Sequence, residues 1–220
     1  MKVKLISYSK PAIEELETPT DLVAFCARVS NPSNQNNSET AEKLIKYLIK
    51  HAHWSPLEMV SVCLEIETTR DIARQILRHR SFSFQEFSQR YADPTKELEF
   101  VSREARLQDL KNRQNSVQVD NEWLQLQWKA YQSDVVLAAK RAYKWAIDNN
   151  IAKEQARAVL PEGLTMSRMY MNGTLRSWVH YIQLRSANGT QREHMEIARE
   201  CAVVIAKIFP IIFSITEEQS

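Results

Sequence analysis

The spacing of apolar positions changes along the chain, and each change predicts a different element. Residues 1–8 (MKVKLISY) predict an opening strand. Between residues 58 and 68, Val60, Val62, Leu64 and Ile66 alternate with other residues, which is typical of a strand with one buried face. Residues 166–171 predict another strand. The pattern therefore predicts a small sheet of two or three strands.

Apolar residues at helical spacing predict five to six helices around these strands. Asp21 can cap a first helix, and Ser38 can open a second one near the end of the polar loop 31–40. Thr190 and Glu193, three residues apart, have the pattern of a capping box. Further helices are expected at 70–79, at 153–160 before Pro161, at 175–186 after the cap Thr174, and from Thr190 through Ile208.

One long helix is predicted over residues 121–149. Its apolar residues step alternately by four and three, as in a coiled-coil seam. The seam consists of Leu124, Trp128, Tyr131, Val135, Ala138, Ala142 and Trp145. Aromatic residues on such a stripe are typical of a core or a subunit interface rather than of a cofactor site. The preceding section, 102–120, is polar and without period, and predicts a mobile or variable connection.

The expected fold class is α+β, with a small, mostly antiparallel sheet and several helices. No internal repeat, low-complexity tract or clear linker divides the chain, so residues 1–220 are expected to form a single domain.

Charge is balanced, with 29 basic and 27 acidic residues, and this argues against a long polyanion such as nucleic acid as partner. No apolar run approaches the roughly 20 residues that span a bilayer, and the amino terminus lacks a secretory signal. We therefore expect no membrane partner and a cytoplasmic location, or the host cytoplasm for a viral protein.

Cysteines and glycines are few, and their positions exclude several kinds of site. The three cysteines are far apart and lack a C-x-x-C pair, which argues against a disulfide framework and a thiolate zinc site. With three glycines in the chain, a G-x-G-x-x-G or Walker loop is effectively excluded. Any bound nucleotide must therefore be held by side chains.

The segment RHRSFSFQEFSQRY, from Arg78 to Tyr91, combines cations with three phenylalanines. Guanidinium groups grip phosphate and aromatic walls hold flat rings, so the segment indicates a nucleotide pocket. One alternative is a basic helix end, where the helix dipole favours cations. Another is a nucleic-acid-binding patch with Phe82, Phe84 and Phe87 as stacking platforms.

Three other clusters have candidate chemistry. His53 precedes Ser55 and Glu58 at a loop-to-strand junction, and a metal hydrolase using His51, His53 and His79 is a weaker alternative there. Arg157 follows Glu154 on a short helix, where an ordinary surface ion pair is equally expected. Arg176 and His180, four residues apart, share a helix face, and Arg185 lies at the far end of the same helix. Ser88 has no activating base other than Glu86, so we interpret it as a hydrogen-bond donor rather than a nucleophile.

The chain resembles the flavin-dependent thymidylate synthases over most of its length. The matching motifs are Ala27-Arg28-Val29-Ser30, His53-x-Ser55-Pro56-x-Glu58, Arg74-Gln75 before RHR-x7-S, Ser88-x-Arg90-Tyr91, Glu154-x-x-Arg157-x-x-Leu160-Pro161 and Arg176-x3-His180-x4-Arg185. The resemblance implies conversion of dUMP to dTMP, with methylenetetrahydrofolate as carbon donor and NADPH as reductant through FAD. No active cysteine is needed in this chemistry. It also implies a homotetramer with active sites at subunit interfaces.

The resemblance also implies roles for individual residues. Arg157, Ser88, Arg185 and His53 are expected to be catalytic. The expected dUMP ligands are Gln75, Glu86, Ser88, Arg90, Arg157 and Arg185. The expected FAD ligands are Ser30, His53, Ser55, Glu58, Arg78, His79, Arg80, Thr174, Arg176, His180 and Gln191. Thr174 stands where many members have Asn, and either Gln191 or His194 takes the place of a histidine in the compact version of this loop. No metal is expected.

Overall fold

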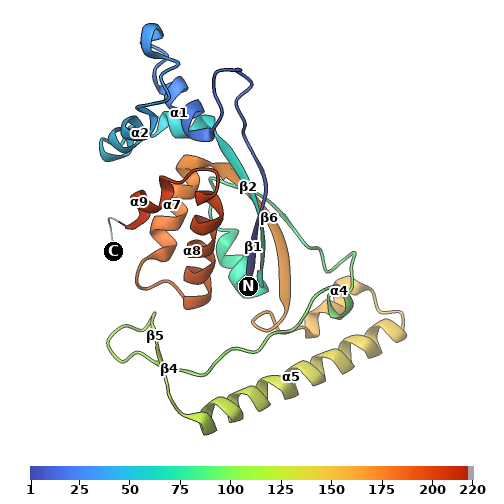
Figure 1. Ribbon diagram of the computed structural model, residues 1–220. Helices are drawn as coiled ribbons and strands as arrows, with labels where there is room; N and C mark the ends of the chain where they lie inside the picture. Colours follow the sequence, from blue (N-terminus) through green and yellow to red (C-terminus); the bar gives the residue numbers. More distant parts are fainter. Residues whose placement is uncertain (218–220) are drawn as a thin grey trace.

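Four antiparallel strands form the central sheet of the computed structural model, which describes residues 1–217 (Figure 1). Their order is β1 (Lys2–Tyr8), β2 (Ser61–Thr69), β6 (Met166–Thr174) and β3 (Ser83–Glu86). β2 and β6 pair along their whole lengths, from Ser61 opposite Thr174 to Thr69 opposite Met166. The expected α+β class with a small antiparallel sheet is confirmed. The strand β3 was not predicted, because four residues are too few to establish a period of two.

The hydrophobic core lies between this sheet and the helices α3 (Arg70–Ile76), α7 (Leu175–Ser186) and α8 (Arg192–Ala206). The helix α9 (Ile212–Glu217) follows and packs against α7 and α8. Val62, Leu64 and Ile66 of β2 are fully buried, as their alternation predicts. The indole of Trp178 in α7 donates to the carbonyl of Val62 at 3.0 Å, which ties the helix to the sheet. Burial of this apolar surface is the main stabilising contribution.

A lobe at one end of the sheet contains α1 (Pro19–Ala27) and α2 (Ala41–Lys50), with the short 3₁₀ helices η1 (Pro32–Asn34) and η2 (Ser55–Met59) (Figure 1). Asp21 was predicted to cap α1, but the cap is Thr18, and Asp21 is the third helical residue of a capping box. α2 begins three residues after the predicted Ser38, at Ala41.

The long helix α5 (Glu122–Asp148) extends at the other end of the molecule, as predicted (Figure 1). Near it lie α4 (Pro94–Glu97), α6 (Lys153–Ala156) and the 3₁₀ helix η3 (Arg157–Val159), which ends before Pro161. The seam predicted on α5 is not buried within the protomer, since Trp128, Tyr131 and Trp145 are 44%, 64% and 62% exposed. The buried positions of α5 are Gln132, Ala139, Tyr143 and Ala146. The prediction of a core seam is therefore wrong, whereas a subunit interface stays a prediction.

The section 102–120 is more ordered than its composition predicted. It contains the hairpin of β4 (Arg106–Gln108) and β5 (Ser116–Gln118). Gln132 of α5 accepts from the amide of Arg103 at 2.8 Å and donates to its carbonyl at 2.9 Å. Gln125 makes the same pair of bonds with Ala105, at 2.7 and 2.9 Å. These glutamines satisfy backbone groups as a neighbouring strand would, so an aperiodic segment is held in place.

One further local prediction is wrong. Thr190 does not form a capping box, because α8 begins at Arg192 and Glu193 bonds Gln191 and Arg106 instead. Phe82 and Phe84 are partly buried and pack against the core, where Phe82 meets the Trp178 ring edge-on at 4.9 Å, and their role as aromatic walls stays a prediction.

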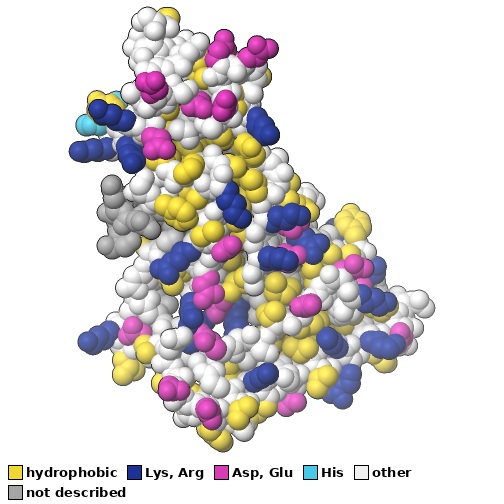
Figure 2. All heavy atoms as spheres, viewed as in Figure 1, with side chains coloured by type: hydrophobic (Ala, Val, Ile, Leu, Met, Phe, Trp, Pro, Cys, Tyr) yellow, Lys and Arg dark blue, Asp and Glu magenta, His cyan; other side chains and the backbone are white. Residues whose placement is uncertain are grey.

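Basic and acidic side chains are intermingled over the face seen in Figure 2, in agreement with the balanced composition. Apolar side chains also reach the surface along α5. Among the helices in the described part of the chain, none combines the length and apolar character that crossing a membrane demands.

Candidate active site

The residues singled out in the sequence fall into three groups in the protomer. The first lies where α3, α7 and α8 meet and includes Gln75, His79, Arg185 and Gln191. The second lies around the turn after β3 and includes Ser88, Arg90 and Arg157. The third lies at η2 and the beginning of α7.

In the first group, Arg185 lies at the end of α7 and contacts the turn after α3. Its Nε donates to Nε2 of His79 at 2.9 Å. His79 must therefore be neutral, with its proton on Nδ1. Burial and the charges of Arg185 and Arg78 lower the pKa of His79 to about 4. Among the described residues, no bond of the two Nη groups of Arg185 is found, so both can meet a ligand.

Gln75 of α3 is held between two residues of the α8 region. It donates to the Oε1 of Gln191 at 2.8 Å, and its Oε1 faces Nδ1 of His194 at 3.2 Å. His194 is fully buried and also contacts the hydroxyl of Tyr181, at 3.1 Å. Both candidates for the loop position, Gln191 and His194, thus contact Gln75. Tyr181 was not predicted, because nothing in its local sequence distinguishes it from an ordinary core residue.

The second group surrounds the exposed ion pair of Arg90 and Glu154, at 3.4 Å. Arg157 donates to the carbonyl of Glu154 at 3.3 Å, so the expected ion pair within the helix does not form. Ser88 Oγ accepts a long bond from the Arg90 amide, at 3.4 Å. Within residues 1–217, no bond from the Ser88 hydroxyl to a carboxylate or imidazole is found. Ser88 is therefore not activated as a nucleophile in this arrangement.

Glu86 lies nearby in β3 and has protein partners. It accepts from Ser167 Oγ at 2.7 Å and lies 3.5 Å from the guanidinium of Arg70. The Arg70 side chain is 9% exposed, so this pair is largely shielded from water. Arg70 was not predicted, because the helical pattern alone does not distinguish it from a surface cation.

In the third group, Arg176 forms an ion pair with Glu58. The rings of His180 and Trp54 are in tilted contact, with centroids 4.4 Å apart and planes at 55°, and burial together with Arg176 lowers the pKa of His180. Thr174 caps α7, as predicted, by accepting from the Ser177 amide. His53, just before η2, and Ser55, its first residue, are exposed, and Ser30 is exposed after α1.

Arg78 and Arg80 follow directly after the end of α3, so the helix-end interpretation describes their position correctly. Both are exposed, and the described part of the chain offers neither of them a carboxylate partner. His79, between them, contacts Arg185 rather than His51 or His53, which does not support a shared metal site. Two unpaired guanidinium groups on one turn are suited to an anionic ligand.

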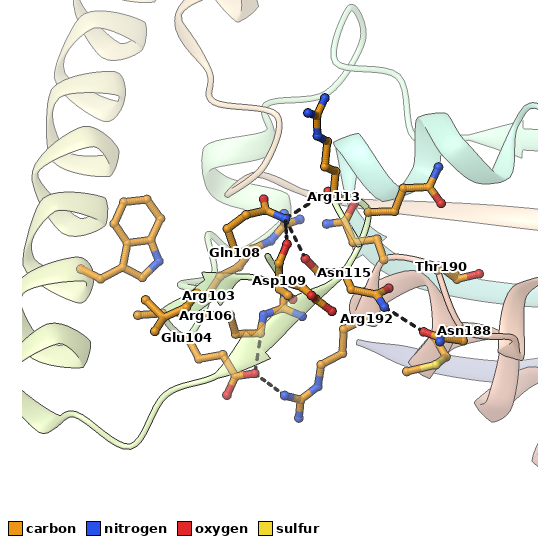
Figure 3. A pocket seen from close by; sticks show the side chains of 18 of the residues that line it. Arg103, Glu104, Arg106, Gln108, Asp109, Arg113, Asn115, Asn188, Thr190 and Arg192 are labelled. Atoms are coloured by element: carbon orange, nitrogen blue, oxygen red, sulfur yellow. Dashed lines mark hydrogen bonds and ion pairs between the residues drawn. The ribbon is translucent and has the colours of Figure 1, made fainter. Parts of the chain in front are cut away.

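A cavity of about 800 Å³ opens beside the first group, between the β4–β5 hairpin, α5 and the loop before α8 (Figure 3). Figure 3 shows Arg106 and Arg192 directed toward Glu104, with the Asn115–Asn188 bond closing one side. Gln191 lines this cavity and also bonds Gln75, so the cavity adjoins the first group. The cavity could not be predicted from the sequence, because the section 102–120 shows no strand period and the hairpin that lines the cavity is formed by contacts in space.

The thiols carry no sign of activation. Burial raises the pKa of Cys26, Cys63 and Cys201. A reactive cysteine needs a lowered pKa, which an electropositive neighbourhood provides. Cys201 is fully buried, as expected of apolar filler, whereas Cys26 and Cys63 are half-buried.

Comparison with known proteins gives consistent matches over the whole chain. Residues 11–211 match the family described as thymidylate synthase complementing protein. The chain is 48% identical over 212 residues to a probable flavin-dependent thymidylate synthase of Paramecium bursaria Chlorella virus 1, covering 96% of this chain and 97% of the relative. It is 46% identical over 220 residues to the flavin-dependent thymidylate synthase of Synechocystis sp., covering 99% of this chain and all (100%) of the relative.

Solved structures with the same fold include a UMP/dUMP methylase, PolB, from Streptomyces cacaoi. Bound with 5-Br dUMP, it matches with a TM-score of 0.79 and 25% identity, covering 97% of this chain and 93% of that chain. Bound with 5-Br UMP, it matches with a TM-score of 0.80 and 26% identity, covering 97% and 92%.

Proposed function

This chain belongs to the family of flavin-dependent thymidylate synthases, and on that premise we propose that it methylates dUMP reductively to dTMP. Methylenetetrahydrofolate would provide the carbon, and NADPH would provide the electrons through FAD. The enzyme would work without a cysteine nucleophile. The names of the relatives and the bound nucleotides of the PolB structures support a uridine nucleotide as substrate.

The nucleotide would be held by the first and second groups together. Ser88 and Arg90 would bind the dUMP phosphate, with Gln75 and Glu86 beside them. Arg157 and Arg185 would contact the base and stabilise negative charge on its carbonyl side. Arg185 is suited to this role because its Nε is already bonded to neutral His79, which fixes the plane of the guanidinium.

The chemistry of the third group and of Arg78–Arg80 fits FAD. The guanidinium groups of Arg78 and Arg80, which have no carboxylate partner among the described residues, suit its phosphates, and imidazole and hydroxyl groups suit its ring system. Ser30, His53, Ser55, Glu58, Arg78, His79, Arg80, Thr174, Arg176, His180 and Gln191 would hold it. When bound, FAD supplies the hydride chemistry that side chains lack. In the protomer these groups lie on separate elements, which supports sites completed between subunits of a homotetramer.

The observation that carries the proposal is that residues of α3, α7 and the α8 region meet in the first group. Gln75 bonds Gln191, Arg185 bonds His79, and the ring of His79 lies beside that of His194. The first test is the absorbance spectrum of the purified protein, which should show flavin bands. FAD-loaded protein should then form dTMP from dUMP only when both methylenetetrahydrofolate and NADPH are present. A colourless protein that does not take up FAD would overturn the proposal.

Cysteine independence is tested separately. The variant Cys26→Ser/Cys63→Ser/Cys201→Ala should keep dTMP formation near the wild-type rate, since none of these thiols is activated.

Ser88→Ala should weaken dUMP binding by one or two hydrogen bonds, about 1–3 kcal/mol. Complete loss of turnover with dUMP binding intact would instead make Ser88 a nucleophile.

A further inference from the structure

A chain of side-chain hydrogen bonds runs through the interior from α7 to the β4–β5 hairpin. It begins at Tyr181, whose Oη lies 3.1 Å from Nε2 of His194. It continues from His194 to Gln75 at 3.2 Å and from Gln75 to Gln191 at 2.8 Å. Gln191 then donates to Glu193 at 2.9 Å, and Arg106 donates to the other oxygen of that carboxylate.

The carboxylate of Glu193 determines which atom donates and which accepts in each bond of this chain. The oxygens of Glu193 accept, so Gln191 must present its Nε2 to them and its Oε1 to Gln75. Gln75 must then present its Nε2 to Gln191 and its Oε1 to His194. The amide orientations are thus dictated by the bonding itself, because the reverse orientation would bring two acceptors together at Glu193.

The same logic assigns the tautomer of His194. Its Nδ1 faces an amide oxygen and carries the proton, which leaves Nε2 to accept from the Tyr181 hydroxyl. This arrangement needs a neutral ring. Burial and the charges of Arg185 and His79 lower the pKa of His194 to about 3, so the ring stays neutral at physiological pH.

We propose that His194 is a positioning residue that fixes the Gln75 amide for a nucleotide ligand. It acts together with Gln191, which bonds Gln75 and is itself oriented by Glu193. The proposal rests on the proposed function, in which Gln75 binds dUMP. An amide has two hydrogens and two lone pairs on its polar atoms. With one of each engaged by Gln191 and His194, Gln75 offers one N–H and one lone pair in fixed directions. A rotating amide would offer either end.

The decisive experiment compares two amide replacements of His194. In His194→Asn, the side-chain amide reaches the place of Nδ1 and can donate to Gln75. In His194→Gln, the amide reaches the place of Nε2 and can serve Tyr181 but not Gln75. The dissociation constant for dUMP is measured on FAD-loaded protein, with flavin absorbance as the check on cofactor content. His194→Gln should weaken dUMP binding about three- to tenfold, as for one uncharged hydrogen bond, and His194→Asn should recover most of the loss.

A double-mutant cycle shows whether His194 acts through Gln75. In a Gln75→Leu background, His194→Gln should have no further effect on dUMP affinity. Gln132→Leu is the matched control, because Gln132 is also a buried glutamine bonded on both sides, but to the backbone of Arg103. It should lower the thermal midpoint while leaving dUMP affinity unchanged.

The outcomes separate this inference from the proposed function. Wild-type protein that does not bind dUMP would overturn the proposed function. Wild-type protein that binds dUMP, with the Asn and Gln variants equally weakened or equally unaffected, would overturn the positioning role of His194. Additive effects in the Gln75→Leu background would overturn it as well.

Discussion

At the scale of single residues, Arg78 and Arg90 differ in their surroundings although they lie in one short segment. Arg78 is exposed beyond α3, with no carboxylate partner among the described residues, whereas Arg90 pairs with Glu154 across 3.4 Å. Both Arg90 and Glu154 are about half exposed, so this pair contributes little to stability. Both guanidinium groups are exposed, so each can reach a ligand from solvent.

We therefore predict that the two arginines serve different ligands. Arg90→Ala should weaken dUMP binding by about 1.5–3 kcal/mol, as for one charge-assisted contact, while FAD stays bound and reducible by NADPH. Arg78→Ala should release flavin or slow its reduction. Lysine should rescue neither fully, because a point charge cannot replace a planar fork. Titrations of dUMP and FAD on both variants test this assignment.

The control for Arg90 is Glu154→Gln, which removes its ion-pair partner and leaves the guanidinium in place. This variant should bind dUMP at least as tightly as the wild type. Equal loss of FAD from both alanine variants would contradict the assignment of these two arginines.

The buried histidines make stability depend on pH in a defined direction. The pKa values of His194 and His79 are lowered to about 3 and about 4 in the folded protein. The unfolded chain takes up these protons near pH 6.5, so it binds more protons than the folded chain below that pH. Stability should therefore be full above about pH 6.5 and fall as the pH is lowered toward 4, by up to about 1.4 kcal/mol per pH unit for fully buried His194.

Urea unfolding at several pH values between about 7.5 and 5.5 measures this dependence. The upper part of this range avoids the titration of ordinary carboxylates. His194→Asn should have a shallower dependence than the wild type, since it lacks the titrating ring. Parallel curves for the two proteins would show that His194 is not the cause.

At the scale of elements, the contact between β6 and the segment before β3 allows no side chain at Gly173. A Cβ at this position would lie closer than 3.0 Å to the ring of Phe82. That ring is held edge-on against Trp178 at 4.9 Å, so it cannot move aside freely. Glycine at 173 is thus required by packing, not by backbone conformation.

Gly173→Ala should destabilise the fold by about 1–3 kcal/mol, as overpacking of a core typically does. Gly163→Ala is the matched control, because a Cβ there would meet only Asp71 Oδ2, at 4.0 Å. The free energies of unfolding of both variants are compared by chemical denaturation. Equal effects of the two substitutions would show that the Phe82 contact is not the reason for Gly173.

At the scale of the whole molecule, α5 presents its predicted seam outward. Trp128, Tyr131, Val135 and Trp145 are all at least 44% exposed. The helix is held to the rest of the chain by another face, through Gln132, Tyr143 and their neighbours. An exposed aromatic stripe of this kind marks an interaction surface, and the family resemblance favours a second copy of the chain as its partner.

We predict a homotetramer, with a mass by light scattering of about four times the 25.6 kDa of one chain. Tyr131→Glu should give smaller species and reduce activity, because subunit contacts would complete the sites. Ser133→Glu is the control, since it lies about 200° around the helix from Tyr131. An active monomer at micromolar concentration would contradict sites shared between subunits.

By itself the sequence determined those features whose cause is local. The alternation in β2, the length of α5 and the cap Thr174 depend on neighbours within a few residues, and the structure agrees with each. The family could also be assigned from the order and spacing of short motifs. Local patterns did not show that Phe82 packs against the core or that the section 102–120 is bonded to α5, because these contacts depend on partners distant in the chain.

Only the tertiary structure decided which polar residues meet. His194 and Gln75 are separated by 119 positions, and Arg185 and His79 by 106. The tautomers of both histidines follow from these contacts, and so does the direction of the Gln75 amide. Tertiary contacts also decided which face of α5 packs on the protomer. Gln132 is buried on that face because it bonds the backbone of Arg103, which lies beside it only in the folded chain. A hydrophobic pattern predicts which residues avoid water, but a hydrogen bond depends on where its partner lies.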